Sequence, residues 1–190
     1  MESTELNKEN LLKGTTILGD LDSKITIVEF GDYQCTFCYK FHRDTMNQIK
    51  EKYVDSQIVN FAYKDFPLNG DASRMASEAS YCAQKQDKFW EYHNTIYDNW
   101  EGENTGWITL QALLKFAQDS ELNIEEFDLC MNKSEFRQKV ENNEAFARSI
   151  NVDATPSFLI FNDKNVYRII GAQPFEKFEK IIQELETSGK

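Results

Sequence analysis

The chain has 190 residues, of which 41% are hydrophobic and 28% charged, so it can bury a core within one domain, or within one domain that carries a large insertion. Its formal net charge of −11 is spread along the chain and argues against a nucleic-acid partner, because phosphate binding needs a cationic surface. No apolar run reaches the roughly 18 residues that indicate a membrane span.

The first third of the chain has the pattern of a βαβ unit. Residues 25–30 are mostly β-branched and apolar, which predicts a buried strand. Apolar residues at mostly helical spacing predict a helix from Cys35 to about Tyr53. Residues 58–66 alternate and predict a second strand, which Pro67 ends. Strand, helix and strand in this order imply parallel pairing.

The middle of the chain has a different period. Residues 69–150 carry apolar side chains at helical spacing, which predicts several helices over roughly 80 residues. Asn123 with Glu126, and Asn132 with Glu135, each have the spacing of a capping box at a helix start.

Strand patterns return near the end of the chain. Residues 157–161 and 166–170 predict two short strands joined by a hairpin turn, and Pro174 opens a last helix. The fold class is therefore α/β, a small sheet flanked by helices, with a helical block inserted in it. The expected division is an N-terminal part of the α/β domain, an all-helical insertion and a C-terminal ββα part, at residues 1–66, 67–153 and 154–190.

Cys35 and Cys38 form a CxxC motif where the first strand gives way to its helix. Cysteines at this spacing close a disulfide only in a turn or at the start of a helix. Free backbone N–H groups and the helix dipole favour negative charge there, which lowers the pKa of Cys35 and makes it a nucleophile and a good leaving group. Cys38, one turn further in, is more shielded and suits the role of resolving thiol.

Glu29 is the only charged residue of the first predicted strand, and it precedes Cys35 by six positions. Strand alternation places it on one face with Ile25 and Ile27. If it is buried there, the pKa of its carboxyl rises and it can exchange a proton with Cys38. The alternative is a glutamate at the strand end that reaches solvent, and position alone does not decide between the two.

Thr155-Pro156 opens a strand directly after the helical block, which makes it a candidate for a cis peptide bond. Together with the CxxC motif and Glu29, it resembles the DsbA-like branch of the thioredoxin superfamily, over nearly the whole chain. This resemblance implies a thioredoxin fold, a central mixed sheet flanked by helices, with an inserted all-helical subdomain. The segments that carry it are residues 27–38, 64–68, 88–93 and 154–158.

The resemblance also implies roles for five residues. The first cysteine, Cys35, attacks, and the second, Cys38, resolves. Glu29 tunes proton transfer, Pro156 packs over the disulfide in cis, and Thr155 pairs with the substrate backbone. Lys64 is a looser match to a basic partner of the buried acid.

Thr36 and Phe37, between the cysteines, depart from the family pattern, in which proline often follows the first cysteine and strong oxidases have histidine before the second. Both are expected to contact substrate. Phe37 cannot donate a hydrogen bond to the thiolate, and the acidic residue Asp32 nearby also disfavours the thiolate. We therefore expect a less oxidising disulfide than that of DsbA. Because isomerase-type relatives also carry threonine at the position of Thr155, the direction of electron flow stays open.

Cys82 and Cys130 lie on apolar faces of predicted helices in the insertion. Three interpretations compete: the two cysteines are bonded to each other, are reduced in the core, or join Cys35 and Cys38 in a zinc site. Some DsbA-like proteins have a cysteine pair in the insertion, so the resemblance favours a structural disulfide. Such a bond indicates an oxidising compartment.

The expected function is a thiol–disulfide oxidoreductase that acts on protein or peptide substrates with thiols or disulfides. It forms a mixed disulfide at Cys35, a separate redox partner recycles it, and no cofactor or metal is required. The alternatives are a disulfide reductase or isomerase, and a non-catalytic binding or chaperone module on the same fold. Residues 1–14 lack the basic start and apolar core of a signal peptide. We expect an exported or membrane-tethered, extracytoplasmic protein whose targeting segment lies outside this sequence.

Overall fold

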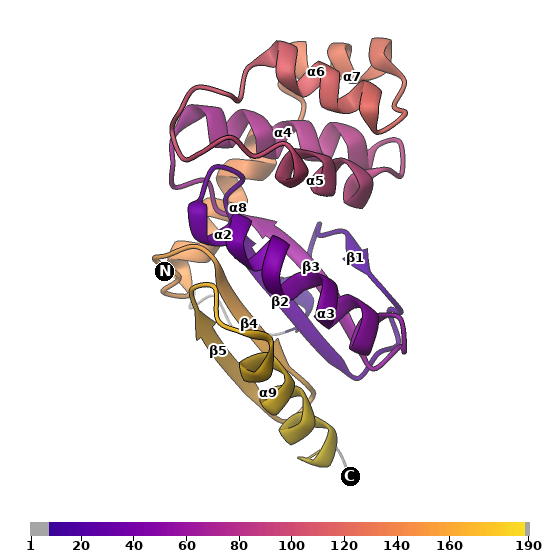
Figure 1. Cartoon of the computed structure of the whole chain (residues 1–190), viewed down its shortest axis with the longest axis vertical. Coiled ribbons are helices and arrows are strands. Elements are labelled where there is room, and N and C mark those ends of the chain that lie inside the picture. Colours follow the sequence, from indigo (N-terminus) through magenta and orange to yellow (C-terminus); the bar gives the residue numbers. More distant parts are fainter. Residues whose placement is uncertain (1–7, 189–190) are drawn as a thin grey trace.

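A five-stranded sheet in the order β1-β3-β2-β4-β5 forms the centre of the computed structural model, which describes residues 8–188 (Figure 1). Strands β2 and β3 are parallel, and the other neighbouring pairs are antiparallel. The sheet is therefore mixed, as expected for the α/β part of the chain. The strands are β1 (Ile17–Leu18), β2 (Ile25–Gly31), β3 (Val59–Asp65), β4 (Ser157–Phe161) and β5 (Val166–Ile170).

Helices cover both faces of the sheet, and this is why every residue of β2 is buried. Ile25 and Ile27 face the side that is closed by α9 and by the helix after the cysteines. Val28 and Phe30 alternate to the other side, where α1 and the end of α8 pack. The three outer helices are α1 (Lys8–Leu12), α8 (Arg137–Ser149) and α9 (Phe175–Ser188).

The helix predicted after the cysteines is present and continues through four consecutive segments. Two of them are π-helical, and π turns occur frequently at functional sites. Apolar spacing does not distinguish them from α-helix, so the sequence predicts the helix but not its widened turns. The segments are α2 (Thr36–Phe41), η1 (His42–Met46), α3 (Asn47–Ile49) and η2 (Lys50–Val54).

Five helices lie between β3 and β4 in the chain, and all of them except the last, α8, pack at one end of the sheet (Figure 1). They have a core of their own, which includes Tyr92, Leu113 and Phe127, and the same cluster reaches Cys35 and Cys38. The insertion therefore forms one wall around the cysteines. Besides α8, its helices are α4 (Asp71–Gln84), α5 (Phe89–Asp98), α6 (Leu110–Asp119) and α7 (Ile124–Asn132). The proposed division after residues 66 and 153 stays a prediction.

One of the two predicted capping boxes marks a helix start, but only its N-cap half is formed, because the N–H of Asn123 donates to the Gln86 side chain at 2.7 Å. The side chain of Asn123 accepts a hydrogen bond from the backbone N–H of Glu126 at 3.2 Å and caps α7. The second prediction is wrong, because Asn132 ends α7 instead of starting a helix. Helix α7 continues that far because Cys130 and Met131 are buried in the core of the insertion.

The first two described elements, α1 and β1, have no counterpart in the sequence prediction. Strand β1 is two residues long and pairs antiparallel with β3 at the edge of the sheet, which is too short for a periodic pattern. No helix within residues 8–188 combines the length and apolar character needed to cross a membrane.

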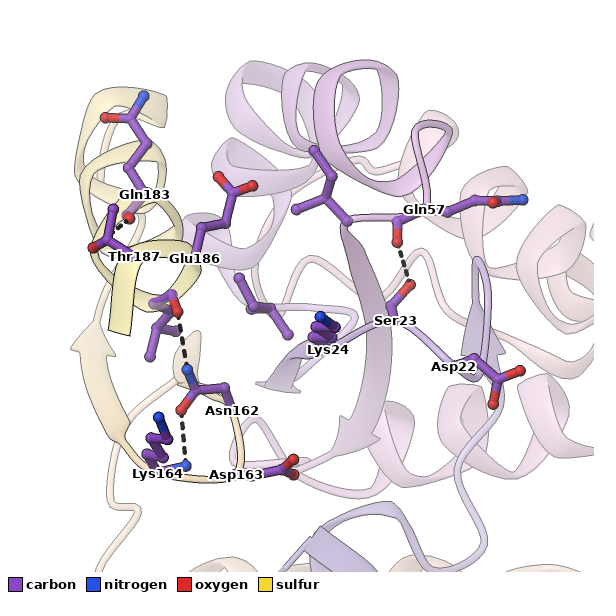
Figure 2. A pocket seen from close by; sticks show the side chains of 13 residues that line it. Asp22, Ser23, Lys24, Gln57, Asn162, Asp163, Lys164, Gln183, Glu186 and Thr187 are labelled. Carbon is purple, nitrogen blue, oxygen red and sulfur yellow. Dashed lines mark hydrogen bonds between the residues drawn. The ribbon is translucent and has the colours of Figure 1, made fainter. Parts of the chain in front are cut away.

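A cavity of about 860 Å³ lies at the end of the sheet opposite the cysteines (Figure 2). It is enclosed by the chain before β2, the turn after β4 and the end of α9. Two polar side chains of its lining are paired with the protein: the Ser23 hydroxyl donates to the Gln57 carbonyl at 3.0 Å, and the Asn162 amide donates to the Leu185 carbonyl at 3.0 Å. We assign no ligand to this cavity.

Candidate active site

The turn between β2 and α2 places Cys35 at the N-cap position of the helix, with extended backbone angles. Its N–H donates to the carbonyl of Asp32 at 3.1 Å. The Asp32 carboxylate accepts the backbone N–H groups of Gln34 at 2.8 Å and Asn69 at 2.7 Å, which fixes the turn against the start of the insertion. Gly31 is required just before it, because a Cβ there would collide with the ring of Tyr63.

Both cysteines are free thiols and both are buried, but to different degrees. Cys35 is 6% exposed and Cys38 is 0% exposed, so only Cys35 offers its sulfur to a partner. A hydrogen bond from the Cys38 thiol lowers the pKa of Cys35 to about 6 against the opposing effect of burial. Burial raises the pKa of Cys38 well above its ordinary value, and the backbone N–H of Asp32 donates to its sulfur at 3.4 Å. Cys35 therefore forms a thiolate readily, whereas Cys38 stays a protonated thiol.

Thr155 and Pro156 lie against this pair, although they are far away in the sequence. The peptide bond between them is cis, and the thiol of Cys35 donates to the Thr155 carbonyl at 3.4 Å. Strand β4 starts at the next residue and pairs with β2, which brings the loop to the cysteines. The loop thus presents a backbone carbonyl beside the reactive sulfur.

Glu29 is 3% exposed, which excludes the alternative of a strand-end glutamate in solvent. Burial raises the pKa of its carboxyl well above the ordinary value, and the nearby charge of Cys35 adds to this. Lys64 is not its partner, contrary to the looser part of the resemblance. In the register of β2 and β3, Lys64 pairs with Phe30 and points to the opposite face, where it donates to the Asn143 side chain at 3.3 Å.

The residues between the cysteines have different surroundings. Phe37 is 55% exposed, and the Lys40 ammonium lies 5.1 Å from the centre of its ring. Thr36 is held by Glu103, a residue of the insertion: its N–H and its hydroxyl donate to one carboxylate oxygen at 3.0 and 3.1 Å. Sequence reasoning does not identify Glu103, because no motif links it to the cysteines.

Cys82 and Cys130 lie apart from this site and form a disulfide between α4 and α7. This bond uses the two sulfurs that a four-cysteine zinc site needs. Within residues 8–188, no group of three or more cysteine, histidine and acidic side chains is arranged to hold a metal ion.

The lowered pKa of Cys35 predicts when the reduced protein reacts with an alkylating agent. The thiolate is the reactive form, so modification of Cys35 by iodoacetamide should rise with a midpoint near pH 6 and level off above it. Mass spectrometry of the labelled protein measures this. A midpoint near the roughly 8.5 of an ordinary thiol would contradict the electrostatic description of the site.

Comparisons with known proteins include relatives that are named for disulfide bond formation. A family model described as Thioredoxin matches residues 12–184. The chain is 28% identical to disulfide bond formation protein D of Bacillus subtilis over 182 residues, which cover 94% of this chain and 79% of that protein. It is 30% identical to the probable disulfide bond formation protein D of Bacillus anthracis over 148 residues, 75% of this chain and 68% of that one.

Two solved structures are also similar along most of their length. The crystal structure of oxidised BdbD from Bacillus subtilis has a TM-score of 0.81 and 27% identity, and the match covers 91% of this chain and 93% of that one. The crystal structure of alpha-DsbA1 from Wolbachia pipientis has a TM-score of 0.81 and 26% identity, with 92% of each chain covered.

Proposed function

Because the chain belongs to the thioredoxin family, and within it to the DsbA-like thiol–disulfide oxidoreductases, we propose that it exchanges disulfides with the cysteines of protein substrates through Cys35 and Cys38. One observation supports this most directly. A cysteine with a pKa of about 6 lies beside a fully buried thiol and beneath a cis Thr155-Pro156 bond. This arrangement offers one sulfur to a substrate and keeps the second in reserve.

The proposed oxidation runs in two steps. A substrate thiolate attacks the Cys35 sulfur of the oxidised pair, the Cys35–Cys38 bond breaks, and a mixed disulfide forms. The second substrate thiolate then attacks the substrate sulfur of that bond and releases Cys35 as a thiolate. Two electrons pass from the substrate to the enzyme. In reverse, the same steps reduce a substrate disulfide.

Glu29 is the proposed proton carrier. Cys38 leaves the oxidised pair as a thiolate, and its raised pKa means that it must take up a proton. The carboxyl of Glu29 is buried and its own pKa is raised, so it can hold a proton for Cys38 where water does not reach. In the reverse direction, its carboxylate accepts the proton before Cys38 attacks.

The substrate is expected to bind across the cis loop. Thr155 would pair with its backbone beside Cys35, since the Thr155 carbonyl is already within 3.4 Å of the sulfur, and Pro156 would pack against the mixed disulfide. Thr36 and the exposed ring of Phe37 extend this surface on the other side of the cysteine. An apolar residue near the substrate cysteine would cover the Phe37 ring.

We favour oxidation of substrates by a disulfide that is less oxidising than that of DsbA. Reduction or isomerisation is the second candidate. A Cys35 pKa of about 6 lies between those of the reactive cysteines of DsbA, about 3.5, and thioredoxin, about 7. We therefore expect a reduction potential between about −120 mV, the value of DsbA, and about −270 mV, the value of thioredoxin. Equilibration of the purified protein in glutathione buffers measures it. A value at the thioredoxin end would favour a reductase, and one at the DsbA end would contradict the predicted effect of Phe37.

The disulfide between Cys82 and Cys130 supports a location outside the cytoplasm, where such bonds persist. A separate thiol–disulfide protein would then return the Cys35–Cys38 pair to its active redox state. The non-catalytic alternative is disfavoured, because a binding module has no use for a cysteine with a lowered pKa.

A further inference from the structure

The loop between α5 and α6 lies over the start of the helix that carries the cysteines. The ring of Trp100 stacks on Tyr39, with 4.4 Å between ring centres and 6° between planes. Its indole N–H donates to the carbonyl of Gln34 at 3.3 Å. The loop is thus attached to one residue before Cys35 and to one residue after Cys38.

The shape of this loop is fixed from within. Gly102 and Gly106 have positive φ angles, 115° and 86°, that L-residues rarely adopt. The indole N–H of Trp107 donates to the carbonyl of Gly102 at 2.8 Å. The loop therefore holds the residue after Gly102, which is Glu103, in a defined position.

Glu103 binds Thr36, the residue that follows Cys35. One carboxylate oxygen accepts both the N–H and the hydroxyl of Thr36, at 3.0 and 3.1 Å. The sulfur of Cys35 is instead stabilised mainly by the Cys38 thiol and, to a smaller extent, by the backbone N–H groups of Cys38 and Phe37. One of the amides nearest to the reactive sulfur is thus occupied by a carboxylate from the insertion.

We propose that Glu103 is a positioning residue that sets the redox balance of the cysteine pair, because its carboxylate is fixed on Thr36 and disfavours the thiolate of Cys35. The inference rests on the proposed function and adds to it. Glu103 is an exposed acidic residue, and like charges in proximity disfavour each other. The reduced pair carries the thiolate and the disulfide does not, so Glu103 destabilises the reduced state and makes the disulfide less oxidising.

The charged residues Glu29, Asp32 and Lys40 also lie near the cysteines, but their surroundings differ from those of Glu103. Glu29 and Asp32 are buried, and burial raises the pKa of both carboxyls. Lys40 is drawn toward the Phe37 ring. Glu103 therefore carries the exposed negative charge that is hydrogen-bonded next to Cys35.

Glu103→Gln tests this, because it removes the charge and keeps an oxygen that accepts from Thr36. Glu103→Ala removes both. Glu101→Gln is the matched control, since it removes an acidic side chain from the same exposed loop, two residues away. Two quantities are measured for each: the pKa of Cys35 from the ultraviolet absorbance of its thiolate, and the equilibrium constant with glutathione. In that equilibrium two glutathione thiols reduce the pair and leave as one glutathione disulfide.

We expect Glu103→Gln to lower the pKa of Cys35 by about half a unit and to raise the equilibrium constant for reduction about threefold. A threefold change corresponds to about 15 mV. Glu103→Ala should change both in the same direction, Glu101→Gln should leave both unchanged, and high salt should reduce the difference from wild type.

If Glu103→Gln matches the wild type and only Glu103→Ala differs, the contact is structural and the inference is wrong. Failure of the proposed function is a separate result: the wild-type protein would then not exchange disulfides at all. The pKa measurement does not depend on any substrate, so it decides the role of Glu103 in that case too.

Discussion

Replacing Cys35 by serine will abolish disulfide exchange with peptide substrates, with a loss of roughly 10³-fold or more. Serine keeps the size and the hydrogen bonds of the side chain but cannot form the mixed disulfide. Cys38 cannot take over, because it is fully buried and its pKa is raised. The rate of oxidation of a reduced model peptide that contains two cysteines measures the effect.

Two matched variants separate the steps of this reaction. Cys38→Ser should still let the Cys35 thiolate attack a disulfide-bonded peptide but should accumulate the mixed disulfide, because the attack by Cys38 that releases the reduced peptide is lost. Glu29→Gln should keep both cysteines and slow turnover by roughly 10²-fold, because Cys38 loses its proton carrier. Exchange at the wild-type rate after Cys35→Ser would overturn the proposed function, and a wild-type rate in Glu29→Gln would remove Glu29 from the mechanism.

Removal of the disulfide between Cys82 and Cys130 has the largest expected effect on stability. The bond joins residues 48 positions apart, and closing a loop of that length lowers the entropy of the unfolded chain. The change Cys82→Ala/Cys130→Ala should lower the free energy of unfolding by about 4 kcal/mol and the melting temperature by roughly 10 °C. Thermal unfolding followed by circular dichroism measures this.

The control for that variant is the reducing agent itself. Wild-type protein should lose most of the same stability when it is unfolded in excess reductant, whereas the double variant should respond only to reduction of its Cys35–Cys38 pair. Equal melting temperatures for the wild type and the variant under oxidising conditions would contradict a structural role for the bond.

The sequence predicts those parts of the molecule that depend on local pattern. Strands β2, β4 and β5 follow from short apolar runs, and the position of Cys35 follows from a strand that ends just before it. The burial of Glu29 was undecided, because burial depends on what packs against the strand. The packing of α2 and the insertion against that strand decides it.

Local sequence pattern does not predict contacts between distant segments of the chain. Glu103 lies 67 residues from Thr36 in the sequence, and nothing in a loop of glycines and polar residues marks one carboxylate as special. The assignment of Lys64 to Glu29 failed for a related reason. Neighbouring residues of a strand point to opposite faces, and only the register between β2 and β3 reveals which face Lys64 takes.

The order of the strands in the sheet differs from the order in which a ribosome makes them. Strand β2 lies between β3 and β4, yet β4 follows it by more than a hundred residues, because the whole insertion is synthesised first. Until β4 is added, one edge of the central strand has no neighbour and Cys35 has no Thr155 carbonyl beside it. The nascent chain therefore carries its CxxC motif long before the motif acquires its finished surroundings, and the completed active site is among the last features of the molecule to form.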